Sequence, residues 1–197
     1  WSYVVGLSAG HTLQPVLAMT TDASRYAKRI AVLMKEKIAV VPYAPEWPEH
    51  YSELEARLKK LLPKNLVQRI AHIGSTAVPG LSAKPIIDVQ VVAKYRDEVL
   101  ERVVPVLEAE GFEFIWRPSI GESAPFYAWF IVRDAQGNRT AHIHILSPDQ
   151  KSAERIIFRD LLRKHPAEAA AYEALKVQLA KEFAKDLGYP LVVRPSF

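Results

Sequence analysis

The chain has 197 residues, 26 of them basic and 22 acidic, with a formal net charge of +4 and no cysteine. This length suits a single domain with its own core, and the lack of cysteine excludes a disulfide scaffold and a thiolate metal site. The basic excess is too small for a dedicated nucleic-acid binder, so nucleic acid is not an expected partner. We expect a cytoplasmic domain in which histidine or carboxylate side chains bind any metal.

The first 37 residues are expected to be an extension, and residues 38–190 are expected to form the main domain. Residues 1–19 are fairly apolar, but polar residues such as His11 and Gln14 interrupt them, and no basic segment precedes them. They therefore predict neither a membrane span nor a signal peptide.

The first half of the main domain is predicted to hold one helix and two strands. After Pro48, apolar residues at helical spacing predict a helix with one face in the core (Tyr51, Leu54, Leu58 and Leu61). Strands are predicted over residues 68–73 and 85–93, with a loop over residues 74–84 between them. The second strand is almost continuously apolar, so we expect it to be buried on both faces.

The second half is predicted to alternate strands with helices. Gly111 predicts the end of a helix over residues 95–110, and residues 134–138 are typical of a hairpin turn. Ser147 is predicted to be a helix N-cap, with Pro148 as the first helical residue. The other predicted elements are strands over residues 112–116, 125–133 and 140–146 and helices over residues 150–164 and 167–187. This order predicts an α/β (α+β) fold, a mixed sheet flanked by helices with a C-terminal helix pair.

A glycine–serine turn and a lone aspartate on the next strand are the strongest indications of chemistry. Gly74 and Ser75 offer backbone amides and a hydroxyl to a phosphate, and Lys84 offers a counter-charge. The alternative is a tight turn beside a solvated lysine. Asp88 lies within a buried strand, so it is predicted to be a metal ligand, with Mg or Mn as candidate ions, or one half of a buried ion pair.

Three histidines are predicted to approach Asp88. His142 and His144 share one face of their strand, and His72 precedes the glycine–serine turn. Neutral imidazole with a carboxylate is a transition-metal ligand set, protonated imidazole would bind phosphate, and isolated histidines usually satisfy backbone groups. A histidine here is also a candidate base that accepts the proton of an attacking hydroxyl.

Five motifs in chain order make residues 38 to about 180 resemble the GrpB family. They are PY-x-P-x-W (Pro42 to Trp47), HIGSTAVPGL-x-AKPIID (His72 to Asp88), HIH (His142 to His144), FRD-x-LR-x-HP (Phe158 to Pro166) and Y-x-x-LK (Tyr172 to Lys176). The family is similar in fold to the nucleotidyltransferase superfamily, where a Gly-Ser pair precedes an Asp-x-Asp strand with two metal-binding carboxylates. GrpB-like domains occur fused to dephospho-CoA kinase in some bacteria, which implies a coenzyme A pathway enzyme as a candidate partner.

Arginines recur every four residues on the first of the two C-terminal helices. For Arg155 and Arg163, such a stripe is typical of a solvated helix face. Arg159 belongs to the FRD motif of the resemblance, and its guanidinium could fork onto a phosphate or onto Asp88. Lys176 on the last helix is a weaker candidate for the same ligand-binding role.

The chain departs from the superfamily pattern at Gln90, which stands where the second carboxylate would be. Residues 88 and 90 share a face in a regular strand, so Gln90 is expected to point into the same pocket as Asp88. One interpretation is a nucleotidyl or phosphoryl transferase, or a binder of a nucleotide-like phosphate compound. A second is a non-catalytic partner or chaperone-like module, which Gln90 favours. A third, a metal-dependent hydrolase, requires the histidines to converge on one metal.

Overall fold

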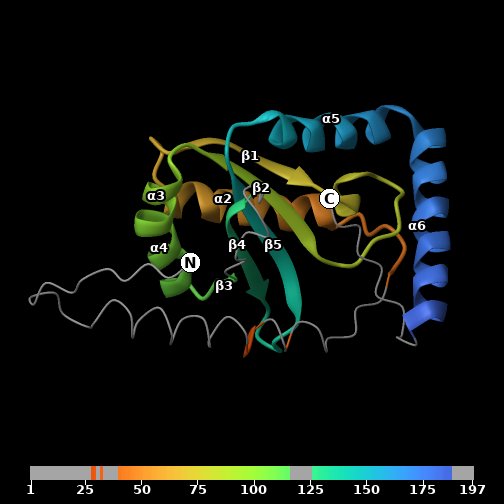
Figure 1. The fold of residues 1–197 in the computed structure, drawn as a ribbon, viewed down its shortest axis with the longest axis horizontal. Coiled ribbons are helices and arrows are strands. Elements are labelled where there is room, and N and C mark those ends of the chain that lie inside the picture. Colours follow the sequence, from red (N-terminus) through yellow and green to blue (C-terminus); the bar gives the residue numbers. More distant parts are fainter. Residues whose placement is uncertain (1–27, 30–31, 33–39, 116–125, 188–197) are drawn as a thin grey trace, which may run out of the picture. The chain divides into compact units, whose positions relative to one another are not determined.

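A mixed five-stranded sheet with the order β1-β2-β5-β4-β3 organises the computed structural model (Figure 1). The structure describes residues 28–29, 32, 40–115 and 126–187. By its contacts the chain divides into two compact units, residues 1–36 and residues 37–197. Nearly all of the first unit lies outside the described residues, so the extension expected at the N-terminal end stays a prediction.

The candidate site is carried by two interior strands of the sheet, β2 (Ile87–Ala93) and β5 (Arg139–Leu146). β1 (Val67–Ile73) lies beside β2 as an edge strand. β1 pairs with β2 in antiparallel register, and β2 pairs with β5 in parallel register. β2 therefore has a neighbour on each side. All of its residues are buried except the half-buried Asp88, as the apolar run predicts.

β4 (Phe126–Arg133) and β3 (Glu113–Ile115) continue the sheet beyond β5, and each is antiparallel to its neighbour. A tight turn joins β4 to β5. Asp134 Oδ1 stabilises this turn by accepting hydrogen bonds from the backbone amides of Gln136 and Asn138. The hairpin predicted here is confirmed. The predicted strand ends at residues 116 and 125 lie outside the described residues.

α2 (Trp47–Leu61) packs on one face of β1 and β2 and lies behind them in Figure 1. Leu58 is fully buried there, as the helical spacing of apolar residues predicts. Tyr51 stacks on His72 of β1, with ring centroids 4.7 Å apart and an interplanar angle of 7°. The face of the sheet that carries His72 is therefore the face covered by α2.

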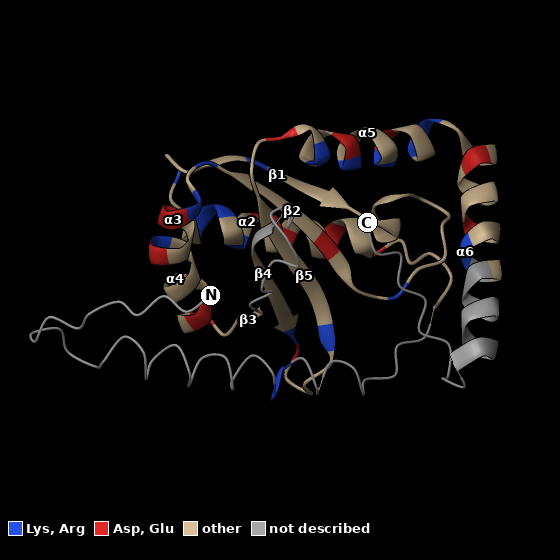
Figure 2. Ribbon diagram, viewed as in Figure 1, with Lys and Arg blue, Asp and Glu red and all other residues tan. Residues whose placement is uncertain are grey.

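α5 (Gln150–Lys164) covers the opposite face. Ile156 packs with Ala71 and Ile73 of β1, and side chains alternate between the faces of a strand, so these two residues point away from His72. Charged residues of both signs lie along α5 (Figure 2). α6 (Pro166–Leu187) follows, which confirms the C-terminal helix pair. Within the described residues, no helix is both long and apolar enough to cross a membrane.

The helix predicted over residues 95–110 is confirmed as an uninterrupted helical run over residues 96–109. It comprises α3 (Arg96–Glu98), a π-helical turn η2 (Val99–Val103) and α4 (Val104–Ala109). Pro105 lies just after the π-helical turn. In the middle of a regular helix, a proline removes a hydrogen bond and clashes with the preceding turn. The π-helical turn, which was not predicted, lies where this irregularity is expected.

The N-cap of α5 is Asp149 rather than Ser147. The Asp149 carboxylate accepts a hydrogen bond from the backbone amide of Ser152 at 2.9 Å, and the Ser147 hydroxyl donates to the same carboxylate at 2.7 Å. A carboxylate accepts both donors and is attracted to the positive end of the helix. Pro148 therefore precedes the helix instead of opening it, which corrects the predicted capping box.

Candidate metal centre

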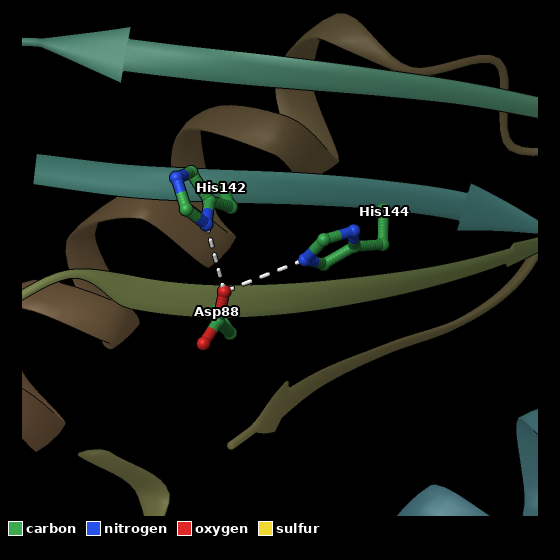
Figure 3. A group of neighbouring side chains, drawn as sticks. All are labelled: Asp88, His142 and His144. Atoms are coloured by element: carbon green, nitrogen blue, oxygen red, sulfur yellow. Dashed lines mark hydrogen bonds and ion pairs between the residues drawn. The ribbon is translucent and has the colours of Figure 1, made fainter. Parts of the chain in front are cut away.

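Asp88, His142 and His144 meet on the α5 face of the sheet (Figure 3). The parallel register of β2 and β5 sets Asp88 opposite His142 and Gln90 opposite His144. Residues two apart on a strand share a face, so all three side chains of the cluster project to the same side. Asp88 Oδ1 lies 3.1 Å from His142 Nδ1 and 3.4 Å from His144 Nε2. The predicted approach of these two histidines to Asp88 is confirmed.

The cluster is largely shielded from water but not closed. The side chains of His142 and His144 are 17% and 16% exposed, and that of Asp88 is 32% exposed. His142 Nε2 is buried and makes no hydrogen bond with any described residue. A buried ring nitrogen in this state costs free energy, which is typical of a functional site rather than of a core.

The protonation states of the cluster suit metal binding. Burial alone would raise the pKa of Asp88, but hydrogen bonds and charge interactions with His142 and His144 outweigh it and hold that pKa well below its ordinary value. Burial lowers the pKa of His144, although Asp88 acts in the opposite direction. At neutral pH an ionised carboxylate therefore faces a neutral imidazole, and these are the forms in which both groups bind metals.

The distances within the cluster also fit one ion. One candidate ligand atom from each residue lies within 4.8 Å of the other two. Ligands bound at about 2.0–2.2 Å from a shared ion are themselves roughly 3.0–3.5 Å apart, which matches both distances from Asp88. Two imidazoles and one carboxylate suit Mn, Fe, Co or Zn better than Mg, which prefers oxygen ligands. The candidate centre therefore consists of Asp88, the predicted metal ligand, and the two histidines that the sequence offers as a transition-metal ligand set with it.

Gly74 fixes the position of the carboxylate from the end of β1. Its φ of +74° is left-handed, and a Cβ at this position would lie 2.7 Å from Asp88 Oδ2. A side chain here would be strained and would press on the carboxylate. Gly74 therefore lets Asp88 lie against the turn, and its predicted role in a phosphate cradle stays a prediction.

His72 is not part of the cluster. It pairs in register with Val89, whereas Ile73 pairs with Asp88, so the His72 ring faces α2 on the other side of the sheet. Its Nε2 lies 3.0 Å from the Thr76 hydroxyl, and its ring stacks on Tyr51. The expectation that His72 and Asp88 line one pocket is corrected by this alternation of side chains.

Ser75 and Lys176 meet in a second polar cluster on the loop after β1. Lys176 Nζ donates to the Ser75 hydroxyl at 2.7 Å and to the Ser82 carbonyl at 3.5 Å. Glu173 accepts a hydrogen bond from the Ser82 amide at 3.0 Å. Burial lowers the pKa of Lys176, and Glu173 acts against that shift. These contacts fasten α6 to the loop, and the ligand-binding roles of Ser75 and Lys176 stay predictions.

Arg159 does not hydrogen-bond or pair with Asp88. Its guanidinium donates to the His72 carbonyl at 2.7 Å and pairs with Asp160 at 2.7 Å. It therefore holds α5 against the end of β1, and its predicted phosphate contact stays untested. Lys84 is half-buried and precedes β2 by three positions, and its role as a counter-charge also stays a prediction.

Gln90 shares the face of Asp88 but lies beneath α5. It is fully buried, and its Nε2 donates to the Ser152 carbonyl at 2.9 Å. The shared face was predicted correctly, whereas the expectation that Gln90 points into the pocket was wrong, because a helix covers it. At the position where the superfamily pattern has its second carboxylate, this chain therefore has a residue that joins the sheet to α5.

Two residues near the cluster were not predicted to belong to a site. Trp129 of β4 pairs in register with His144 and stacks parallel to it, at 6.2 Å between ring centroids. Arg155 of α5 is half-buried; burial lowers its pKa, and the negative charges of Asp88 and Asp149 oppose that shift. The alternation of β4 could have identified Trp129, but the position of Arg155 depends on how α5 lies on the sheet.

These features define an α/β domain with a histidine–carboxylate cluster on a mixed sheet. The family described as GrpB protein matches residues 37–190. The chain therefore belongs to the GrpB family, and the resemblance in its motifs is confirmed.

Similar proteins share the domain over most of this chain. A UPF0157 protein of Pseudomonas aeruginosa is 37% identical over 152 residues, 77% of this chain and 60% of that protein. The UPF0157 protein YqkA of Bacillus subtilis is 32% identical over 149 residues, 75% of this chain and 41% of that protein. The chain thus spans less than two thirds of either relative. The crystal structure of the conserved protein GrpB from Enterococcus faecalis is 34% identical, with a TM-score of 0.60 over 73% of this chain and 84% of that chain.

Proposed function

We propose that Asp88, His142 and His144 hold a divalent metal ion and that the centre acts on a phosphate-bearing small molecule such as a nucleotide. The convergence of the three candidate ligand atoms within 4.8 Å, on two interior strands of the sheet, carries this proposal. When bound, the ion would polarise a phosphoryl oxygen as a Lewis acid. The reaction class is phosphoryl or nucleotidyl transfer, with water as an alternative acceptor.

The chain's own residues divide the remaining tasks. Before an ion binds, Asp88 orients both imidazoles through one oxygen, and the surrounding sheet limits the water around them. A ring nitrogen bound to metal cannot accept a proton, so the histidines would be ligands rather than the general base proposed from the sequence. The base would then be another group or the substrate itself.

The buried Gln90 favours chemistry with one metal ion. In a nucleotidyltransferase-like site, a second carboxylate would help to hold a second ion, and here that position is capped by α5. We therefore place the chain nearer to a single-ion transferase or hydrolase than to a nucleotidyltransferase with paired ions. Similarity of its fold to that superfamily is part of this proposal.

A second candidate is a non-catalytic partner or chaperone-like module, for example for a coenzyme A pathway enzyme such as dephospho-CoA kinase. The observation in its favour is that Arg159 and Lys176, two of the predicted ligand-binding residues, hydrogen-bond to the fold itself. A module of this kind would keep the sheet and its helices without binding a metal.

Metal binding separates the two candidates. Isothermal titration of the metal-free chain with Mn²⁺ and Zn²⁺ should give one site, and Asp88→Asn should weaken it at least tenfold, about 1.4 kcal/mol, because a neutral amide replaces an anionic ligand. Asp97→Asn removes an exposed carboxylate from α3 and is the matched control.

Equal metal affinity in the parent and in Asp88→Asn would contradict the metal centre. A parent chain that binds neither ion would leave the partner module ahead. For the phosphate-bearing ligand, a thermal-shift panel of nucleotides and coenzyme A precursors with and without Mn²⁺ is suitable, since a ligand at 100 times its Kd adds about 2.7 kcal/mol of stability.

A further inference from the structure

We propose that Ser75 is a nucleophile, that Lys176 is the general base that activates it, and that Ser75 carries the phosphoryl group of the substrate between two steps of the reaction. This inference rests on the metal centre proposed above and names the base that its metal-bound histidines cannot supply. Both side chains are predicted from the sequence to bind a ligand, and here they take part in the chemistry.

The two side chains are in direct contact, although 101 residues separate them in the chain. Lys176 Nζ lies 2.7 Å from Ser75 Oγ, which is within reach of a proton transfer. The Ser82 carbonyl is farther away, at 3.5 Å, so the hydroxyl is the nearer partner of the amine. Ser75 is itself held in a 3-10 turn, η1 (Ser75–Ala77), because its carbonyl accepts from the amide of Val78 at 3.1 Å. A fixed hydroxyl beside a lysine amine is the arrangement by which Ser–Lys enzymes activate a serine.

The surroundings of Lys176 favour the neutral amine, which is the only form that can accept a proton. The side chain is half-buried, and its Nζ lies 5.2 Å from the centre of the Tyr172 ring. Tyr172 packs in turn against an apolar cluster (Val78, Leu81, Leu162 and Ala169). Burial lowers the pKa of Lys176, with the carboxylate of Glu173 acting in the opposite direction. More neutral amine is therefore present at a given pH than on an exposed lysine.

Ser75 also lies beside the candidate metal centre. Gly74 directly precedes it, and a Cβ on Gly74 would lie 2.7 Å from Asp88 Oδ2. Consecutive Cα atoms are about 3.8 Å apart, so the nucleophile begins one residue from the metal-binding carboxylate. Gly74 is exposed and Ser75 is half-buried, so a small molecule can reach the turn. A phosphate bound at the centre would therefore lie close to the Ser75 hydroxyl.

The reaction has two balanced steps. In the first, Ser75 Oγ forms a bond to the phosphorus of the terminal phosphate, and the bond from phosphorus to the leaving oxygen breaks. The hydroxyl proton passes to Lys176 Nζ, and the resulting ammonium gives it to the leaving oxygen. In the second step, water attacks the phosphorus of the phosphoserine, and phosphate is released. The proton lost by the water passes through Lys176 to the Ser75 oxygen, which restores both side chains.

The first test labels the full chain with diisopropyl fluorophosphate, which transfers its phosphoryl group to activated serines and needs no metal. Mass spectrometry of the digested protein should find the label on Ser75. The labelling rate should fall roughly 100-fold in Lys176→Arg, because arginine keeps the charge and the hydrogen bond but cannot act as a base. Ser52→Ala and Lys164→Arg, both at exposed positions, are the matched controls and should label at the parent rate.

Two further measurements separate chemistry from a structural contact. The labelling rate of the parent should rise with pH, with a midpoint below the ordinary lysine value of 10.5, and this rise should be absent in Lys176→Arg. With saturating Mn²⁺ in H₂¹⁸O, the parent should exchange the oxygens of inorganic phosphate, because each cycle of phosphoserine formation and hydrolysis replaces one of them. Ser75→Ala should lose this exchange.

The outcomes separate this inference from the proposed function. No label on Ser75, or equal labelling rates in the parent and Lys176→Arg, would overturn the dyad, while Mn²⁺ binding would leave the metal centre intact. Oxygen exchange that is absent from the parent, or equal in Ser75→Ala, would overturn the phosphoserine. A label on Ser75 in a parent that binds no Mn²⁺ would support the nucleophile and overturn the metal centre. Circular dichroism spectra of each variant check that the fold is retained.

Discussion

Gly74 is the residue whose small size most directly shapes the candidate centre. The left-handed backbone at this position and the close approach of Asp88 Oδ2 both exclude a side chain. Gly80 has a similar φ of +82°, but a Cβ there would meet nothing within 4 Å. Substitutions at the two glycines therefore distinguish the cost of backbone strain from the cost of displacing the Asp88 carboxylate.

Alanine at each glycine should have a different effect on metal binding. Gly74→Ala and Gly80→Ala should each lower the free energy of unfolding by about 1–2 kcal/mol, because an L-residue at positive φ is strained. Gly74→Ala should also weaken Mn²⁺ binding at least tenfold, whereas Gly80→Ala should not. Urea denaturation and isothermal titration measure the two effects, and equal Mn²⁺ affinity in both variants would refute the role of Gly74.

At the scale of elements, the packing of α5 on β2 decides what Gln90 can do. The Gln90 side chain is fully buried and donates to a backbone carbonyl. Replacing it with a carboxylate would remove this donor and bury a charge. Gln90→Glu should therefore destabilise the domain by about 3–5 kcal/mol without tighter Mn²⁺ binding.

The control for this change is Gln90→Met, which keeps the length of the side chain without a charge. It should cost about 0.5–1.5 kcal/mol, the net contribution of one hydrogen bond, because the Ser152 carbonyl lies within α5 and can still accept from the helix backbone. Chemical denaturation ranks the two variants. A stably folded Gln90→Glu protein with increased Mn²⁺ affinity would show that Gln90 reaches the ion after all.

Much of this element-level arrangement follows from local patterns in the sequence. The apolar run of β2, the alternation of His142 and His144, and the turn after β4 each depend on near neighbours in the chain, and each is found as predicted. The π-helical turn before Pro105 was not predicted, although a proline inside a helical pattern is a known cause of such irregularity.

The rest of the site depends on packing between elements. The identity of the strand that pairs with β2 brings Asp88 to the two histidines, and the way α5 lies on the sheet directs Arg159 to the His72 carbonyl instead of to Asp88. No local pattern encodes either property. The same limit applies to His72. The register of β1 against β2 decides which face of the sheet its side chain occupies.

At the scale of the whole molecule, His72 makes stability depend on pH. Burial, followed by the positive charge of Arg163, lowers the pKa of His72 from 6.5 to about 4, with Asp88 acting in the opposite direction. Between these values the unfolded chain binds a proton that the folded chain excludes. Stability is therefore fully present above pH 6.5 and is lost as the pH falls towards 4.

The parent should lose on the order of 3 kcal/mol of unfolding free energy between pH 7 and pH 4 from this residue alone. His72→Gln cannot gain a charge and should lose correspondingly less, although the lowered pKa of His144 leaves a residual effect in the same direction. His165→Gln, at an exposed position, is the control. Urea denaturation at both pH values measures the difference, and identical pH dependence in the parent and His72→Gln would refute this assignment.

The parallel pairing of β2 with β5 also bears on how the chain folds. Asp88 and His142 are 54 residues apart in sequence, and β5, the strand of His142, also forms a hairpin with β4, which precedes it in the chain. The hairpin can close early because its contacts are local, while the parallel pair must first overcome the entropy of a long loop. We therefore expect the three candidate ligands to come together late in folding. An ion bound there would mainly slow unfolding and would leave the folding rate almost unchanged.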